Sequence, residues 1–145
     1  MGVWSESAVS VEYRKPLPAP SEGSRPYWDG LKAGQVRVQR CTACQAYVFY
    51  PRPFCTACLS EALEWVTLCG RGRVYTFTVV RRAMNLAFAD DLPYVYAIVE
   101  LEEGPRVMTN VVRCPVEAVR VDMPVKAVYD SVTSGITLLK FEPAG

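Results

Sequence analysis

The sequence Cys41-Thr-Ala-Cys44 … Cys55-Thr-Ala-Cys58 decides the fold of this chain. Two Cys-x-x-Cys pairs flank the loop 45–54, and each pair can place two thiolates on one metal ion. Zinc accepts four sulfur ligands in a closed tetrahedral site, with no position left for a substrate. The spacing therefore predicts a structural zinc ribbon of the rubredoxin type, with Cys41, Cys44, Cys55 and Cys58 as the metal ligands.

The four cysteines also allow other interpretations: two disulfides, a redox pair or an iron site. A thioredoxin-type redox site uses a single Cys-x-x-Cys beside a βαβ pattern, and this sequence shows no βαβ pattern. Disulfide bonds stay open as an alternative. Iron is the alternative metal to zinc, because an all-sulfur tetrahedron suits it as well.

The length and composition indicate one compact domain with a small appendage. The chain has 145 residues, of which 50% are hydrophobic, enough for a core. No apolar run approaches the roughly 20 residues that a bilayer span needs, so no membrane association is expected. The first residues, Met-Gly-Val-Trp-Ser-Glu-Ser, do not resemble a signal peptide. Four cysteines in metal spacing without an export signal predict a cytoplasmic protein.

Charge and the absence of one residue type exclude several classes of function. The formal net charge is +1, and four thiolates around one divalent zinc bring it to about −1. Nucleic-acid binders usually carry a strong positive charge, so a nucleic-acid partner is not expected. The chain contains no histidine. Catalysis of the Ser-His-Asp or Cys-His kind is therefore excluded within this chain, which is not expected to be an enzyme alone.

Three segments follow one another along the sequence. Residues 1–23 form an extended arm, in which Lys15-Pro-Leu-Pro-Ala-Pro20 has proline at every second position. Residues 24–62 hold a short helix and the zinc ribbon. Residues 63–145 are rich in β-branched and aromatic residues with turn signals between them, which predicts a β domain.

The helix is expected between Ser24, a favourable cap, and Gly34, a favourable stop. Tyr27 and Leu31 are four residues apart and share one face of it. Two short strands are expected around the first cysteine pair, at 36–40 and 47–50.

The β domain is expected to be a small closed barrel. Its strands are predicted at 63–69, 73–82, 94–101, 106–113, 125–132 and 136–141. Gly70 and Gly72 permit a sharp bend or a bulge in the first long strand. Hairpin turns without a long helix fit a five-stranded OB-fold barrel, and an open sandwich is the alternative. The predicted fold is mostly β: an N-terminal helix, a four-cysteine zinc ribbon and an OB-fold barrel.

The loop 83–93 is unusually apolar for a hairpin connection. It either folds over the barrel mouth as a lid or contacts another subunit, and we favour the subunit interface. Strand alternation turns further aromatic side chains outward, where a partner could cover them. The predicted partner-interface residues are Tyr27, Trp28, Met84, Leu86, Phe88, Tyr94 and Tyr96.

Arginines mark both ends of the strand at 73–82, and they are the predicted contacts for coenzyme A or phosphate: Arg71, Arg73, Arg81 and Arg82. Arginine favours planar, bidentate contact with phosphate. With Tyr75 and Phe77 on one face of the strand, the arginines also resemble a platform for single-stranded nucleic acid. Ordinary surface arginine is the third interpretation. Two further cysteines, Cys69 and Cys114, each end an apolar strand, so we expect buried free thiols.

Nearly the whole chain resembles a known family, the zinc-ribbon plus OB-fold proteins termed "domain of unknown function thirty-five". The two Cys-x-x-Cys pairs with their loops are called the knuckles below. Their combination with Gly-Arg-Gly-Arg-Val-Tyr-Thr-Phe-Thr makes the resemblance specific. The residues that carry it, in order, are Tyr27-Trp28, Gly34, Arg40-Cys41-Thr-Ala-Cys44, Pro51-Arg52, Cys55-Thr-Ala-Cys58, Leu63-Glu64-Trp65, Gly70-Arg-Gly72, Tyr75-Thr-Phe-Thr78, Pro93-Tyr94 and Glu100-Leu-Glu-Glu-Gly104.

The resemblance implies an accessory subunit, because such proteins associate with thiolase-like enzymes, and in some cases with hydratases or aldolases, that act on acyl-CoA thioesters. The family's four zinc ligands fall on the four cysteines of the knuckles. A thiolase-like partner would supply the catalytic cysteine and histidines, and coenzyme A or acyl-CoA would be shared with it. The resemblance transfers no motif for coenzyme A contact, so the arginines rest on chemistry alone.

Overall fold

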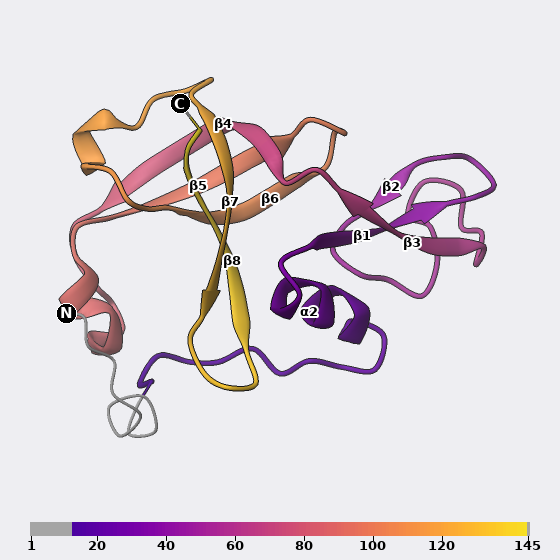
Figure 1. The fold of residues 1–145 in the computed structure, drawn as a ribbon, viewed down its shortest axis with the longest axis horizontal. Coiled ribbons are helices and arrows are strands. Elements are labelled where there is room, and N and C mark those ends of the chain that lie inside the picture. Colours follow the sequence, from indigo (N-terminus) through magenta and orange to yellow (C-terminus); the bar gives the residue numbers. More distant parts are fainter. Residues whose placement is uncertain (1–12, 145) are drawn as a thin grey trace.

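Two β units of different size and a short helix make up the structure, a computed structural model that describes residues 13–144 (Figure 1). The part of the predicted arm at 1–12 lies outside the described residues. Among residues 13–144, no helix is long and apolar enough to cross a membrane. The elements are α2 (Arg25–Lys32), β1 (Val36–Cys41), β2 (Tyr47–Val48), β3 (Leu63–Leu68), β4 (Arg71–Val80), the 3-10 helix η1 (Leu86–Asp91), β5 (Tyr94–Leu101), β6 (Arg106–Val111), the 3-10 helix η2 (Val116–Ala118), β7 (Pro124–Ser131) and β8 (Thr137–Pro143).

Helix α2 confirms the helix predicted from the sequence. A proline in its first turn suits the helix start, where the missing N–H has no intrahelical partner. Tyr27 and Leu31 are buried on one face. Gly34 has a φ of 76°, the left-handed conformation that ends many helices and that glycine adopts without strain. The helix therefore presents one apolar face to the rest of the chain.

The ribbon is a three-stranded antiparallel sheet in the order β2-β1-β3. β3 pairs with β1 along its whole length, from Leu63 opposite Cys41 to Leu68 opposite Val36. The predicted second strand is shorter than expected, since β2 ends at Val48. β3 is thus part of the ribbon sheet, and the division into segments at 62/63 stays a prediction.

The second unit is a closed barrel in the strand order β4-β5-β6-β8-β7, as the sequence predicted in preference to an open sandwich. Its neighbours pair antiparallel except β6 and β8, which are parallel and meet at Val111 and Phe141. The seam between β6 and β8 is therefore the least hydrogen-bonded part of the described barrel.

A β-bulge corrects one prediction about β4. Simple alternation placed Tyr75 and Phe77 on one face of this strand. The pairing with β5 shifts register between Val74 and Thr76, so the face of every later residue changes. As a result Val74 joins Phe77 and Val79 in packing with the core, and Tyr75 is left 45% exposed.

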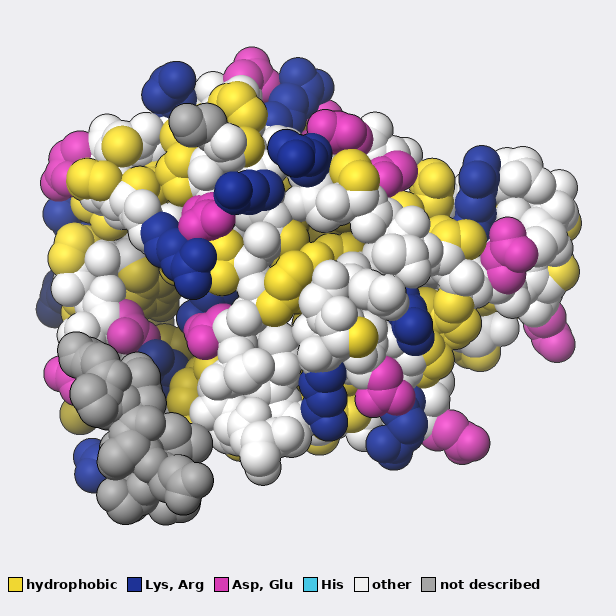
Figure 2. Space-filling view, in the orientation of Figure 1, with side chains coloured by type: hydrophobic (Ala, Val, Ile, Leu, Met, Phe, Trp, Pro, Cys, Tyr) yellow, Lys and Arg dark blue, Asp and Glu magenta, His cyan; other side chains and the backbone are white. Residues whose placement is uncertain are grey.

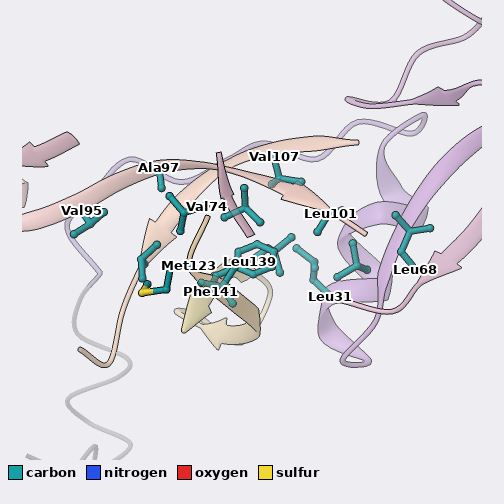
Figure 3. Close-up of a cluster of buried hydrophobic side chains, with 14 of the residues drawn as sticks. Leu31, Leu68, Val74, Val95, Ala97, Leu101, Val107, Met123, Leu139 and Phe141 are labelled. Atoms are coloured by element: carbon teal, nitrogen blue, oxygen red, sulfur yellow. The ribbon is translucent and has the colours of Figure 1, made fainter. Parts of the chain in front are cut away.

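One apolar core extends from the helix through the ribbon sheet into the barrel. Figure 3 shows Leu31 of α2 between Leu68 of the ribbon sheet and Phe141 of the barrel. The Phe141 and Val36 side chains are fully buried. The helix and the two β units are therefore held together by a common core.

Gly72 of β4 lies between two paired strands, because it pairs with Leu101 of β5 on one side and Val125 of β7 on the other. A Cβ atom here would lie 2.4 Å from the carbonyl oxygen of Glu100. We predict that Gly72→Ala lowers the free energy of unfolding by about 3 kcal/mol, measured by urea denaturation. Gly135→Ala is the control, since nothing lies within 4 Å of its added Cβ. Equal losses in both variants would contradict the close approach.

Candidate metal centre

The four cysteines of the two knuckles converge at one end of the ribbon sheet. In the first knuckle the N–H of Cys41 donates to the carbonyl of Ala46 (2.8 Å), and the N–H of Gln45 donates to Cys41 (2.9 Å). In the second knuckle Cys55 and Leu59 make the same two bonds, at 2.8 and 2.9 Å. Gln45 and Leu59 both have a φ of 68°. Two loops of the same construction therefore hold the four sulfurs face to face.

The sulfur positions fit a tetrahedral metal site. All four Sγ atoms lie within 4.8 Å of one another. The Cys41–Cys58 and Cys44–Cys55 sulfurs are 3.6 Å apart. A zinc–sulfur bond of about 2.3 Å requires sulfurs about 3.8 Å apart in a tetrahedron, whereas a disulfide requires about 2.05 Å. The donor set therefore fits a metal ion, and the four cysteines are free rather than disulfide-bonded.

Backbone N–H groups favour the thiolate form of two ligands. A backbone hydrogen bond from Cys44 lowers the pKa of Cys41, and backbone bonds from Cys58 and Ala57 lower the pKa of Cys55 to about 7. A bond from Ser60 acts in the same direction on Cys58, but burial and the neighbouring thiols outweigh it and raise its pKa to about 12. Four adjacent thiolates therefore need a cation to balance their charge.

The ribbon has little apolar core of its own around the sulfurs. Its separate cluster of buried residues consists of Cys41, Val48 and Cys55, with Ala46 and Leu63 packed against it. So small a cluster cannot offset the entropy of ordering two long loops. A metal ion bound by the four cysteines would therefore be the main source of stability for this end of the ribbon.

Gln39 fastens the loop between the two knuckles. Its side chain is 7% exposed, donates to the carbonyl of Arg52 (2.9 Å) and accepts from the Arg52 N–H (2.7 Å). We predict that Gln39→Leu costs about 2 kcal/mol in unfolding free energy, because it leaves two backbone groups unpaired. Faster hydrogen exchange at Arg52 reports this directly. Gln35→Leu is the matched control, because the side-chain carbonyl of Gln35 accepts from the Arg37 side chain (3.1 Å) and not from the backbone of the described residues. An equal loss in this variant would contradict the role of Gln39 in holding the loop.

The residues after β2 connect the ribbon to the helix and to the barrel, and the sequence did not predict this. The Phe49 ring lies 5.5 Å from the Tyr27 ring and 4.2 Å from the Tyr50 ring. The Tyr50 hydroxyl accepts a hydrogen bond from the backbone N–H of Met108 on β6 (3.2 Å). The segment after β2 therefore connects the ribbon to the barrel through a hydrogen bond to β6.

The four arginines predicted as phosphate contacts do not converge. Arg71 and Arg73 begin β4, whereas Arg81 and Arg82 follow its other end. Arg73 already pairs with Glu100 (2.9 Å) and Asp122 (3.5 Å). Contact with coenzyme A or phosphate stays a prediction for these residues.

A charged cluster on the barrel surface was not predicted from the sequence. Arg106 also binds Glu100 (3.2 Å) and stacks over the Tyr75 ring at 3.8 Å. A hydrogen bond from Arg73, and a further one from Arg106, lower the pKa of Glu100 despite partial desolvation. Only the strand register brings these side chains together.

The residues predicted for a partner interface differ in exposure. Met84 is fully exposed and Leu86 is 82% exposed, on and beside η1. Phe88 instead packs near Tyr94, with ring centroids 6.2 Å apart. Tyr96 is 45% exposed, and its hydroxyl donates to the Met108 sulfur (3.0 Å).

Two of the predicted interface residues lie on α2. Tyr27 is buried in the core, and Trp28 is half-buried against Tyr27 in a T-shaped contact at 5.0 Å. The role of all seven residues in a partner interface stays a prediction.

The expectation of buried thiols is wrong for Cys69. β3 ends at Leu68, so Cys69 lies in the link between the two β units and is exposed. Its backbone N–H donates to a carboxylate oxygen of Glu103 (2.9 Å). Cys114 is half-buried, and its burial raises the pKa of its thiol.

Comparison with known proteins identifies both units. Residues 28–64 match the family model "ChsH2, rubredoxin-like zinc ribbon domain", and residues 65–130 match "ChsH2, C-terminal OB-fold domain". The solved structure "Ltp2-ChsH2(DUF35) aldolase" superposes with a TM-score of 0.80 at 32% identity, covering 89% of this chain and 100% of that chain.

Two curated relatives are longer proteins. The chain is 33% identical over 130 residues to a "Probable enoyl-CoA hydratase alpha subunit" of Thermomonospora curvata, covering 90% of this chain and 40% of the relative. It is 34% identical over 95 residues to "Benzoylsuccinyl-CoA thiolase subunit BbsA" of Geobacter metallireducens, covering 65% of this chain and 56% of the relative. The chain thus spans only about half the length of these relatives. It belongs to the ChsH2 (DUF35) family of proteins, which join a rubredoxin-like zinc ribbon to an OB-fold domain.

Proposed function

We propose that this chain is a non-catalytic, zinc-binding subunit of a thiolase-like complex that makes or cleaves carbon–carbon bonds in β-oxoacyl-CoA substrates. The observation that carries the subunit role is the match over a whole solved chain to the DUF35 component of a structure whose name joins two components, "Ltp2-ChsH2(DUF35) aldolase". The likeness to a subunit of a benzoylsuccinyl-CoA thiolase supports the thiolase-like partner. A hydratase or aldolase partner is the alternative, supported by the relative named as a hydratase subunit and by the aldolase named in the solved structure.

The chemistry of the chain supports a structural role for the metal. Four thiolates saturate a zinc ion, which leaves no open position for a substrate or an activated water. The chain has no histidine, so a catalytic cysteine here would lack the base that usually activates it. The catalytic groups would belong to the partner, and four cysteines in metal-ligand spacing support a cytoplasmic location.

The exposed apolar side chains support a docking role. Met84 and Leu86 project from the barrel end, and Tyr96 and Met108 lie side by side on its outer face. Large apolar side chains that are exposed to solvent in the isolated chain are typical of surfaces that bind a partner. Arg71, Arg73, Arg81 and Arg82 remain proposed contacts for a coenzyme A shared with the partner.

Affinity purification of the tagged full chain from the organism that encodes it tests this proposal. We expect a second polypeptide at a fixed ratio, identified by mass spectrometry as a thiolase-like enzyme, with one zinc per chain by elemental analysis. A hydratase in its place would select the alternative. A chain recovered alone and able to turn over acyl-CoA would refute the accessory role. Visible absorption from iron–thiolate bonds would assign iron to the site instead of zinc.

A further inference from the structure

A cavity lies at the end of the barrel that is farthest from the ribbon. Its volume is about 340 Å³, which is within the range of about 300–1,000 Å³ for small-molecule sites. Figure 1 shows η1 at this end, opposite the ribbon. Figure 2 shows the molecule hollowed beside the grey residues, with hydrophobic side chains in the hollow and charged ones along its rim.

The weak seam of the barrel explains why a cavity exists here. β6 and β8 pair only at Val111 and Phe141 in the described barrel, so they leave space beyond this point. Asn110 on β6 and Leu138 and Lys140 on β8 alternate with buried residues and therefore point outward. All three line the cavity, which is thus a groove on the outside of the seam.

The N-terminal arm and η1 close the groove. Lys15 of the arm pairs with Asp91 of η1 at 2.5 Å, and its ammonium lies 5.8 Å from the Phe88 ring and 5.5 Å from the Tyr13 ring. Burial opposes the charge on Lys15, but the hydrogen bond and attraction from Asp91 outweigh it and raise its pKa. A positive charge is therefore held at the mouth of the groove.

Cationic side chains outnumber carboxylates among the residues that line the groove. The charged residues of the lining are Lys15, Arg113 and Lys140, against one carboxylate, Asp91. Two of these cations pair with carboxylates that do not line the groove: Lys140 donates to Asp130 (2.7 Å) and Arg113 to Glu142 (3.0 Å). An ammonium group has three N–H donors, so both lysines can bind a further acceptor without breaking these pairs.

We infer that this groove binds a small carboxylate with an apolar body, and that Lys15 and Lys140 hold its charged end. The apolar walls come from Phe88, Tyr94 and Leu138, which suit an alkyl or aryl group. The ammonium groups supply charge-assisted hydrogen bonds to the carboxylate. The site is separate from the metal centre, and the inference does not depend on the identity of the partner subunit.

Calorimetric titration of the zinc-loaded full chain tests the inference. The probes are octanoate and 4-phenylbutyrate, with octan-1-ol as the uncharged match for octanoate. We expect one-to-one binding of at least one carboxylate and at least about tenfold weaker binding of the alcohol. The carboxylate that binds more tightly shows whether the groove prefers an aliphatic or an aromatic ligand. No carboxylate binding, or equal binding of octanoate and octan-1-ol, would overturn the inference.

Substitutions then place the ligand. Lys15→Met and Lys140→Met should each weaken carboxylate binding about tenfold, whereas Lys32→Met on the exposed end of α2 should leave it unchanged. Zinc content and melting temperature show that each variant is folded. Unchanged binding in both groove variants, or an equal loss in all three, would overturn the inference.

Cys114 provides a local reporter because it is one of the residues that line the groove. The bound carboxylate should slow alkylation of Cys114, measured peptide by peptide with mass spectrometry, and leave the exposed Cys69 unaffected. Equal protection of both cysteines, or of neither, would place the ligand elsewhere and contradict the assignment.

Discussion

Cys41→Ser is expected to abolish metal binding and, with it, the folded ribbon. A serine hydroxyl does not ionise near neutral pH, so the site would lose one of four anionic ligands. Structural zinc contributes about 10–16 kcal/mol of apparent binding free energy in small zinc domains, and the ribbon has few buried residues to replace it. We expect zinc well below one ion per chain, loss of hydrogen-exchange protection in β1 and β3, and failure to recover the partner.

Cys69→Ser is the matched control for this prediction. Cys69 is exposed and lies outside the cluster of four sulfurs, so the same substitution should keep both zinc and partner. A Cys41→Ser protein that loses zinc yet retains a protected ribbon and a bound partner would contradict the structural role of the metal.

Phe141→Ala is expected to give the largest loss of stability in the barrel. The side chain is fully buried, and Phe141 is paired with Val111 where β8 meets β6. Removing the ring leaves a cavity in the common core, which costs about 3–5 kcal/mol. For a chain of this length the melting temperature should fall by roughly 10 °C. Calorimetry of the zinc-loaded protein measures both quantities.

Phe54→Ala, the same substitution at a 41% exposed site, is the control and should cost less than about 1 kcal/mol. The Phe141→Ala protein should keep its zinc, because Phe141 is not part of the cluster around the sulfurs. Comparable losses in the two variants would show that the core does not centre on Phe141. Loss of zinc from Phe141→Ala would show that barrel and metal site unfold together.

The sequence predicted the elements whose signals are local. Two Cys-x-x-Cys pairs on a short loop determine a tetrahedral site whatever surrounds them, and the structure brings the four sulfurs together. Regular turn signals between β-rich runs predicted the closed barrel, and Gly34 correctly marked the end of α2. These features depend on neighbouring residues, so a single sequence suffices to predict them.

Features that depend on strand pairing could not be predicted. The bulge between Val74 and Thr76 changes which face of β4 is buried, and alternation carries no signal of it. The Glu100 cluster likewise depends on the register that places Arg73 and Arg106 opposite it. The hydrogen bond from Met108 to Tyr50 joins residues 58 positions apart. Tertiary pairing alone creates these contacts.

The assay that tests the central claim most directly measures acyl-CoA turnover by the purified, zinc-loaded chain and by the complex that it forms with its partner. We predict carbon–carbon bond cleavage of a β-oxoacyl-CoA by the complex, none by the chain alone, and reduced activity when Cys41→Ser replaces the native chain. Turnover by the isolated chain, or full activity of the partner without it, would contradict the account.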